Sequence, residues 1–192
     1  MKTTIEKIKN DPAYLENIRW GKPRPGHPEA TVEAHIKELE ENLERIRKLV
    51  DEESFDKLSL LAMVHDSFKK DSRSGVPIEH KDSHASLASS YLSGYCDDHD
   101  LINMVQYHDE PYALWRKHSR GRGSIEKRLL SLSGLIQDWD LFMQFNCVDN
   151  ITPGKDCESL EWFLSLPEVK NRMIDSEKID HMVNILKVFR DK

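Results

Sequence analysis

Apolar residues recur at intervals of three and four along most of this chain, a spacing typical of helices that bury one side. No stretch alternates apolar and polar residues as a half-buried strand does. Segments rich in Pro, Gly and Ser, which interrupt helices, lie near residues 23–26, 72–77, 120–123 and 152–155. The pattern predicts an all-α helical bundle with helices near residues 3–9, 29–50, 55–69, 82–95, 98–108, 111–118, 124–149, 157–165 and 176–190.

The predicted helix 29–50 carries a histidine on its buried side. Pro28 and Glu29 are favoured in a first helical turn, so we expect the helix to begin there. Its apolar stripe consists of Val32, Ile36, Leu39, Leu43, Ile46 and Val50. His35 falls on that stripe by helical spacing, so its side chain is expected to point inward. A lone inward histidine is more typical of a hydrogen-bonded core residue than of a ligand.

Two adjacent residues of types that bind metals, His65 and Asp66, close the apolar segment 60–64. By helical spacing, His65 shares a face with Leu58 and Leu61. An unpaired polar side chain on a buried face costs roughly 2–7 kcal/mol, so such residues have partners, and a divalent cation is one that suits both. The pair therefore indicates a metal site if other inward ligands exist.

A carboxylate interrupts the apolar side of the predicted helix 124–149, whose stripe reads Leu129, Leu132, Ile136, Asp140 and Met143. Asp140 would then face the core, although Asp138 and Asp149 are alternatives close by. His35, the His65-Asp66 pair and Asp140 come from three different predicted helices, and together they are the donors of a four-ligand site inside a helical bundle.

Composition sets the class of protein. A chain of 192 residues with 32% charged and 38% hydrophobic residues predicts one globular domain over residues 1–192. There is no long apolar run and no leader-like start, and three cysteines form no close pair, so we expect a cytoplasmic protein without membrane contact. The broad apolar face of helix 176–190 is expected to close the core, with a homodimer contact as the alternative.

The formal charge of −6 argues against nonspecific coating of nucleic acid. Cations nevertheless gather in segment 116–123, where Arg120 and Arg122 flank a glycine. Two interpretations stay open, a solvated loop and a mobile clamp for phosphate, whose oxygens match Arg forks. Lys69 and Arg24 are further candidates for binding phosphate.

The order His35, His65-Asp66 and Asp140 resembles the HD-domain superfamily of metal-dependent phosphohydrolases. Segment 26–32, with His27, looks like the entry to the family's first ligand helix, and Lys69 stands where many members have a lysine. Segments 84–88 and 105–110 look like those that supply further histidines. The resemblance covers roughly residues 20–150, so 151–192 would be C-terminal helices packed on this core.

The resemblance implies a possible second ion bound by His84 and His108. His80 competes with His84, which we favour because Leu87, Ala88 and Leu92 continue its face. Asp109 stands where two-metal members often have histidine, so it is a candidate ligand as well. Segment 136–140 looks like the family's final motif, which favours Asp140, although Trp139 replaces a usual alanine.

The resemblance and the ligand types imply a hydrolase for a small phosphorylated substrate, a phosphomonoester or nucleotide. Several imidazoles favour Mn²⁺, Fe²⁺, Co²⁺, Ni²⁺ or Zn²⁺ over Mg²⁺, with one ion expected and a second possible. Asp66, Lys69, Asp109 and Glu110 are the candidate catalytic residues, and Lys69, Arg24, His27, Arg120 and Arg122 the candidate substrate-binding ones. Two alternatives are a diiron oxygenase of the same superfamily and a non-catalytic module that binds metal or nucleotide.

Overall fold

The computed structural model describes residues 1–23 and 28–190, and in these the all-α prediction is confirmed: helices form without strands. The elements are α1 Lys2–Lys9, α2 Pro12–Ile18, α3 Val32–Ile46, η1 Arg47–Leu49, α4 Glu52–Val64, α5 His84–Ser93, α6 His99–Tyr107, α7 Glu110–Ser119, α8 Glu126–Leu135, α9 Trp139–Asn150, α10 Glu158–Ser165, α11 Pro167–Lys170 and α12 Ser176–Arg190. None of the described helices combines the length and apolar character needed to cross a bilayer.

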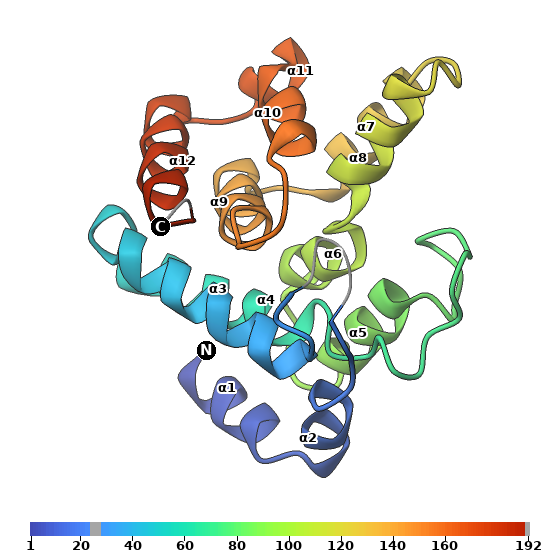
Figure 1. Cartoon of the computed structure of the whole chain (residues 1–192), viewed down its shortest axis with the longest axis vertical. Helices are drawn as coiled ribbons and strands as arrows, with labels where there is room; N and C mark the ends of the chain where they lie inside the picture. The colour runs from blue at the N-terminus through green and yellow to red at the C-terminus, as the bar shows by residue number, and fades with distance from the viewer. Residues whose placement is uncertain (24–27, 191–192) are drawn as a thin grey trace.

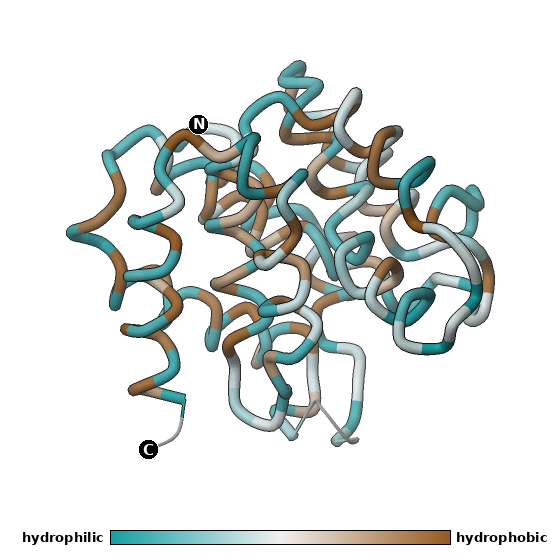
Figure 2. Tube along the Cα trace, turned by 90° about the horizontal axis from the view of Figure 1, so that it is seen from above, coloured by the Kyte–Doolittle hydropathy of each residue, from teal (hydrophilic) through white to brown (hydrophobic). Residues whose placement is uncertain are grey.

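Helix α4 forms the centre of the packing. All its residues from Leu60 to Val64 are buried, and a helix that is apolar on every side needs neighbours on every side. It packs against α3, α9, α6 and α5, while α12 covers α3 and α9 (Figure 1). Hydrophobic and hydrophilic residues alternate along the surrounding helices in Figure 2, as expected where each helix buries one side. The end of α4 therefore lies deep among other helices.

The first ligand helix begins later than its sequence indicates. Pro28 and Glu29 do not open α3; Thr31 caps it, and its side-chain oxygen accepts the N–H of Ala34 at 3.1 Å. Just before the cap, the chain pairs with an earlier segment through an isolated bridge between Gly21 and Thr31. Gly21 has φ +130° and its hydrogen faces the Ala30 carbonyl, so any Cβ there would collide with that oxygen.

The expected single helix 124–149 is two helices. The backbone at Ile136 is extended, and Asp138 caps α9 by accepting the Leu141 N–H. Asp100 on α6 holds the break, because its carboxylate accepts the N–H groups of Gln137 and Asp138 at 2.8 and 2.9 Å. Because of this break, the side of α9 on which a residue lies cannot be counted from the residues of α8.

Other boundaries also differ from the sequence-based expectation. Helix α4 starts after Asp51, which accepts the Ser54 N–H, and it ends at Val64 instead of continuing to residue 69. Helices α2 and α11 were not expected, because both are short and begin with proline. Asp98 caps α6, since its carboxylate accepts the N–H of Leu101.

We predict that Asp100→Ala destabilises the protein by about 1–2 kcal/mol, because two backbone N–H groups at the α8–α9 break lose their acceptor. Urea unfolding measures the change. The exposed Asp97 on the same segment is the matched control, and its alanine variant is expected to stay within about 0.5 kcal/mol of the parent. Equal stability of both variants would contradict the role given to Asp100.

Candidate metal centre

Four histidines and two aspartates meet where five helices begin or end. His35 lies in the first turn of α3, and His65 is the C-cap of α4. His84 is the first residue of α5, His108 directly follows α6, and Asp149 lies in the last turn of α9. Helix termini can turn a side chain toward a shared centre without a kink in any helix. Asp66 follows His65 in the turn that leaves the central helix.

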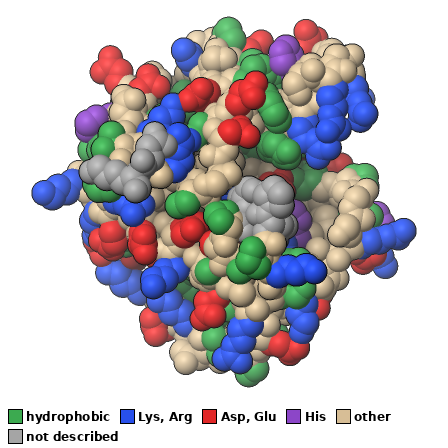
Figure 3. Space-filling view, viewed as in Figure 1, with side chains coloured by type: hydrophobic (Ala, Val, Ile, Leu, Met, Phe, Trp, Pro, Cys, Tyr) green, Lys and Arg blue, Asp and Glu red, His purple; other side chains and the backbone are tan. Residues whose placement is uncertain are grey.

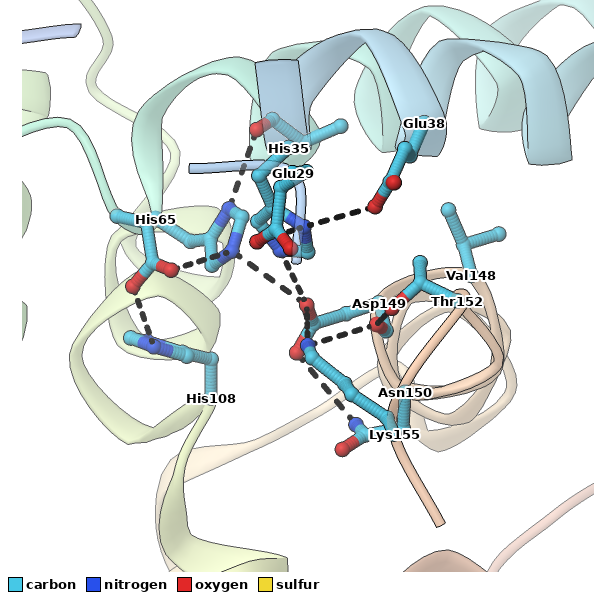
Figure 4. Close-up of polar contacts among 12 residues, drawn as sticks. Glu29, His35, Glu38, His65, His108, Val148, Asp149, Asn150, Thr152 and Lys155 are labelled. Carbon is cyan, nitrogen blue, oxygen red and sulfur yellow. Dashed lines mark hydrogen bonds and ion pairs between the residues drawn. The ribbon is translucent and has the colours of Figure 1, made fainter. Parts of the chain in front are cut away.

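The first group contains His35, His65 and Asp149, all of them buried (Figure 4). Asp149 Oδ1 lies 2.9 Å from His35 Nε2 and 3.7 Å from His65 Nε2. Neighbouring donors around an ion with bonds of about 2.1 Å lie roughly 3.0–3.4 Å apart. Both distances from Asp149 are within a few tenths of an ångström of this range, and the three ligand atoms all lie within 4.8 Å of one another.

The second group contains Asp66, His84 and His108. Asp66 Oδ1 lies 3.5 Å from Nε2 of each imidazole, and the two Nε2 atoms are 3.3 Å apart. Asp109 Oδ2 lies 3.2 Å from His84 Nε2, at the more exposed side of this group. Three donors converge here as well, with a further carboxylate within reach.

Asp66 connects the two groups. Its Oδ2 lies 3.5 Å from His65 Nε2, whereas its Oδ1 faces His84 and His108. A carboxylate placed in this way can give one oxygen to each of two ions. Asp66, a member of the second group, therefore also lies within 3.5 Å of a donor of the first group.

Backbone contacts fix which imidazole nitrogen faces the centre. Nδ1 of His65 lies 3.2 and 3.1 Å from the carbonyl oxygens of Leu61 and Ala62, and Nδ1 of His108 lies 2.8 Å from that of Val105. An Nδ1–H that donates to a carbonyl leaves Nε2 with its lone pair, the usual form of a metal-binding histidine.

Two buried polar atoms in this centre lack a hydrogen-bond partner among the described residues: His65 Nε2 and Asp66 Oδ1. Buried polar atoms are nearly always satisfied, and leaving one unpaired costs about 1–3 kcal/mol. Both atoms are acceptors aimed at the centre, so a cation would satisfy them. The donor set thus fits a divalent metal ion.

Burial and charge act against each other on the titrating groups. Burial lowers the pKa of His65, which favours the neutral ligand form. For His108, burial also disfavours the charge, but the Asp109 and Asp66 carboxylates raise its pKa to about 9. Burial alone would raise the pKa of Asp66, yet the Lys69 ammonium and His65 hold it well below its usual range. Asp66 is therefore ionised.

Two lysines neutralise the buried carboxylates. Lys69 Nζ contacts Asp66 Oδ2, and Lys155 Nζ lies 2.9 Å from Asp149 Oδ1. Although burial opposes its charge, the carboxylates of Asp66 and Asp109 raise the pKa of Lys69. Lys69 also lines a narrow recess together with Trp20, His35 and Asp66, so its ammonium stands at a way into the centre.

The expectation for the final aspartate is wrong: Asp149, not Asp140, lies beside the histidines. Asp140 sits in the first turn of α9 and accepts the backbone N–H groups of Ile174 and Asp175 at 2.9 and 3.1 Å. The prediction that Asp140 faces inward assumed one continuous helix. The backbone is extended at Ile136, so the helical spacing of residues before Ile136 does not extend to Asp140.

Two further candidates lie away from the centre. His80 is bound locally, because its Nδ1 accepts the N–H of Asp82 at 3.1 Å. Glu110 is buried but faces the other way, and Nε of Arg128 donates to it at 2.7 Å. His84 is thus the histidine that joins the second group, and Glu110 ties α7 to α8.

The arginine loop does not reach the metal centre. Helix α7 begins beside His108 and runs outward for ten residues, about 15 Å, before the loop with Arg120 and Arg122 (Figure 1). Both side chains are exposed at that outer end. The two side chains therefore lie away from the candidate metal centre, and their expected role in binding substrate stays a prediction. Arg24 and His27, also expected to bind substrate, lie outside the described residues.

The sequence held a signal for Asp149 that depends on where α9 starts. Phe142, Phe145 and Asp149 share one face of α9, and the Phe145 ring packs edge-on against His65 with centroids 5.3 Å apart. Glu38, three residues after His35, has Oε2 3.7 Å from its Nδ1. Lys155 carried no signal, because it approaches Asp149 from a loop.

In comparisons with known proteins, no family model, curated protein or solved structure matches this chain.

The groove of about 830 Å³ between α1, α3 and α4 has no histidine in its lining. Among the described residues, the histidines and aspartates that could share a metal ion lie at the ends of α3, α4, α5, α6 and α9.

We predict that Asp149→Asn weakens binding of the first ion by more than the roughly 10–100-fold that loss of an outer partner costs, because an anionic donor is lost. Asp140→Asn is the matched control. It should keep parental affinity, since Asp140 contacts backbone N–H groups near α12 instead. Titration calorimetry with Mn²⁺ or Zn²⁺ measures both, and the reverse order of effects would restore Asp140 as the ligand.

We also predict that His84→Ala lowers the bound metal from two ions per chain to one, because the second group keeps only two of its three donors. His80→Ala should leave two ions, since His80 is hydrogen-bonded to its own turn. Elemental analysis after dialysis gives the ratios. A single ion in the parent protein, unchanged in His84→Ala, would argue against the second site.

Proposed function

We propose that this chain is a divalent-metal phosphohydrolase with two ions on either side of Asp66. The observation that carries the proposal is the orientation of this carboxylate, with Oδ2 toward His65 and Oδ1 toward His84 and His108. With Asp149 as the last ligand, the donors follow the order in which they resemble the HD-domain superfamily. Membership in that superfamily is part of the proposal.

The donor set favours a transition metal. Four imidazoles and two carboxylates suit Mn²⁺, Fe²⁺, Co²⁺, Ni²⁺ or Zn²⁺ better than Mg²⁺, which prefers oxygen. When bound, such ions polarise a phosphoryl oxygen and bring the pKa of a coordinated water down to about 7.

Lys69 supplies positive charge for the substrate. Its ammonium contacts Asp66 at the recess, one helical turn from the His65-Asp66 pair, and its side chain is 20% exposed. With a metal ion bound to Asp66, the Lys69 ammonium beside it would be placed to bind a non-bridging phosphoryl oxygen. Charge stabilisation of this kind grows in the transition state, where these oxygens carry the developing negative charge.

Asp109 lies where it can orient the attacking water. Its carboxylate is half-exposed and reaches the second group at 3.2 Å from His84 Nε2. Burial tends to raise the pKa of Asp109, but His108 and His84 lower it, so the group is ionised and accepts hydrogen bonds. An ionised acceptor at the edge of the cage can hold one proton of the water and fix its direction of attack.

The depth of the centre favours a terminal phosphate. His35, His65 and His108 are all buried, whereas His84 and Asp109 lie nearer the surface. A phosphoryl group can enter such a centre while the rest of the substrate stays outside. A phosphomonoester, including a nucleotide, is the substrate class that fits.

The test is release of inorganic phosphate from a panel of nucleotides and phosphomonoesters by protein reconstituted with each metal. Asp66→Asn should reduce kcat by at least about 100-fold, because both groups lose their shared anionic donor. Lys69→Met should lower both kcat and kcat/KM, because the contact that it removes strengthens in the transition state. Asp140→Asn, with its carboxylate outside the centre, should keep parental kcat. Equal phosphate release by the parent and Asp66→Asn would end the proposal.

One observation also favours a second candidate, a diiron oxygenase. The two groups joined by Asp66 give a donor set rich in imidazole, which binds two irons as well as two hydrolytic ions. This arrangement resembles the ligand order of the superfamily's mixed-valence diiron oxygenases. Two irons per chain after aerobic purification, with substrate-dependent oxygen uptake and no phosphate release, would select this candidate.

A further inference from the structure

The arginine-rich end of α7 has no role in the metal centre, yet its side chains are arranged in a regular way. Asp109, Tyr112, Arg116 and Arg120 follow one another at intervals of three, four and four, so they share one side of α7 and its C-cap. Asp109 reaches His84, whereas Arg120 is exposed at the outer end. This side of α7 therefore leads from the metal centre outward for about 16 Å.

The cations at this end are available to an anion. Among the described residues, none of Arg116, Lys117, Arg120, Arg122 and Lys127 pairs with a carboxylate. Figure 3 shows Lys and Arg side chains gathered over the outer ends of α7 and α8. Such a local group stands out in a chain with a formal charge of −6. It would attract a polyanion to one place without coating the protein.

Aromatic side chains lie between these cations. Tyr112 is 46% exposed, its ring stacks on Trp115 with centroids 5.7 Å apart, and the Arg116 guanidinium lies 5.6 Å from its centroid. Unpaired bases stack on flat aromatic rings and on guanidinium planes. An acidic peptide does not need such stacking surfaces in order to bind. The combination of rings and cations favours a nucleic acid strand.

We propose that a single-stranded oligonucleotide lies along this side of α7 with its terminal phosphate in the metal centre. This inference rests on the proposed phosphohydrolase function and names its substrate class. A path of about 16 Å accommodates roughly five stacked nucleotides at 3.4 Å each. Arg116 and Arg120 bind backbone phosphates, and Tyr112 stacks on a base near the reacting end.

The test compares two double variants of equal charge. Arg116→Gln/Arg120→Gln removes two cations from the proposed path, and Lys7→Gln/Lys9→Gln removes two exposed cations from α1. Fluorescence anisotropy with labelled DNA and RNA strands of about ten nucleotides measures affinity at several salt concentrations. The α7 variant should bind about tenfold more weakly or worse, with a salt slope smaller by about 1.4, and the α1 variant should match the parent.

Two further arms define the path. Tyr112→Ala should weaken strand binding about fivefold or more through lost stacking, whereas Tyr112→Phe should retain it. A terminal phosphate on the strand should increase affinity for the metal-loaded parent and not for His65→Ala. The α7 variant should hydrolyse mononucleotides with parental kcat and KM, because neither arginine reaches the centre.

The outcomes separate this inference from the proposed function. Equal binding by the two double variants, or displacement of the strand by polyglutamate as easily as by unlabelled strand, would overturn the inference while leaving mononucleotide hydrolysis intact. Arginine-dependent strand binding without phosphate release from any substrate would instead remove the hydrolase and support the α7 surface as a binding site alone.

Discussion

The structure depends on placing a bridging carboxylate, Asp66, in the interior of an α-helical core. Burying a carboxylate without counter-charge costs several kcal/mol, and here the imidazoles of His65, His84 and His108 lie 3.5 Å from the Asp66 oxygens while the Lys69 ammonium contacts one of them. Such an assembly of polar groups contributes little to stability by itself compared with apolar packing. Its presence where apolar residues would pack well indicates a ligand, and the buried His and Asp groups could hold a divalent metal ion.

The helices bring these groups together through their ends. Because the last residues of α4, from Leu60 to Val64, are buried on every side, this end of the helix lies centrally, and the residues that follow it are buried as well. The break held by Asp100 sets the phase of α9, so that Phe145 and Asp149 face His65. The apolar residues that pack the core therefore also determine the orientation of the His and Asp side chains in the candidate metal centre.

Much of this could be predicted from the sequence, and the failures have one physical cause. Helical spacing correctly predicted that His35 and His65 are buried, because each lies in a continuous apolar stripe. It failed at Asp140, because a three-residue break after α8 is invisible to a periodicity count and shifts every later residue to another side. Lys155 lay beyond any local pattern, since a loop carries it to Asp149.

The most direct test of the account is a crystal structure of metal-loaded protein, with the ions located by anomalous scattering. The account predicts two peaks about 3.5–4 Å apart on either side of Asp66, one among His35, His65 and Asp149 and the other between His84 and His108. An absence of peaks within bonding distance of Asp66, or a single ion held elsewhere, would contradict it.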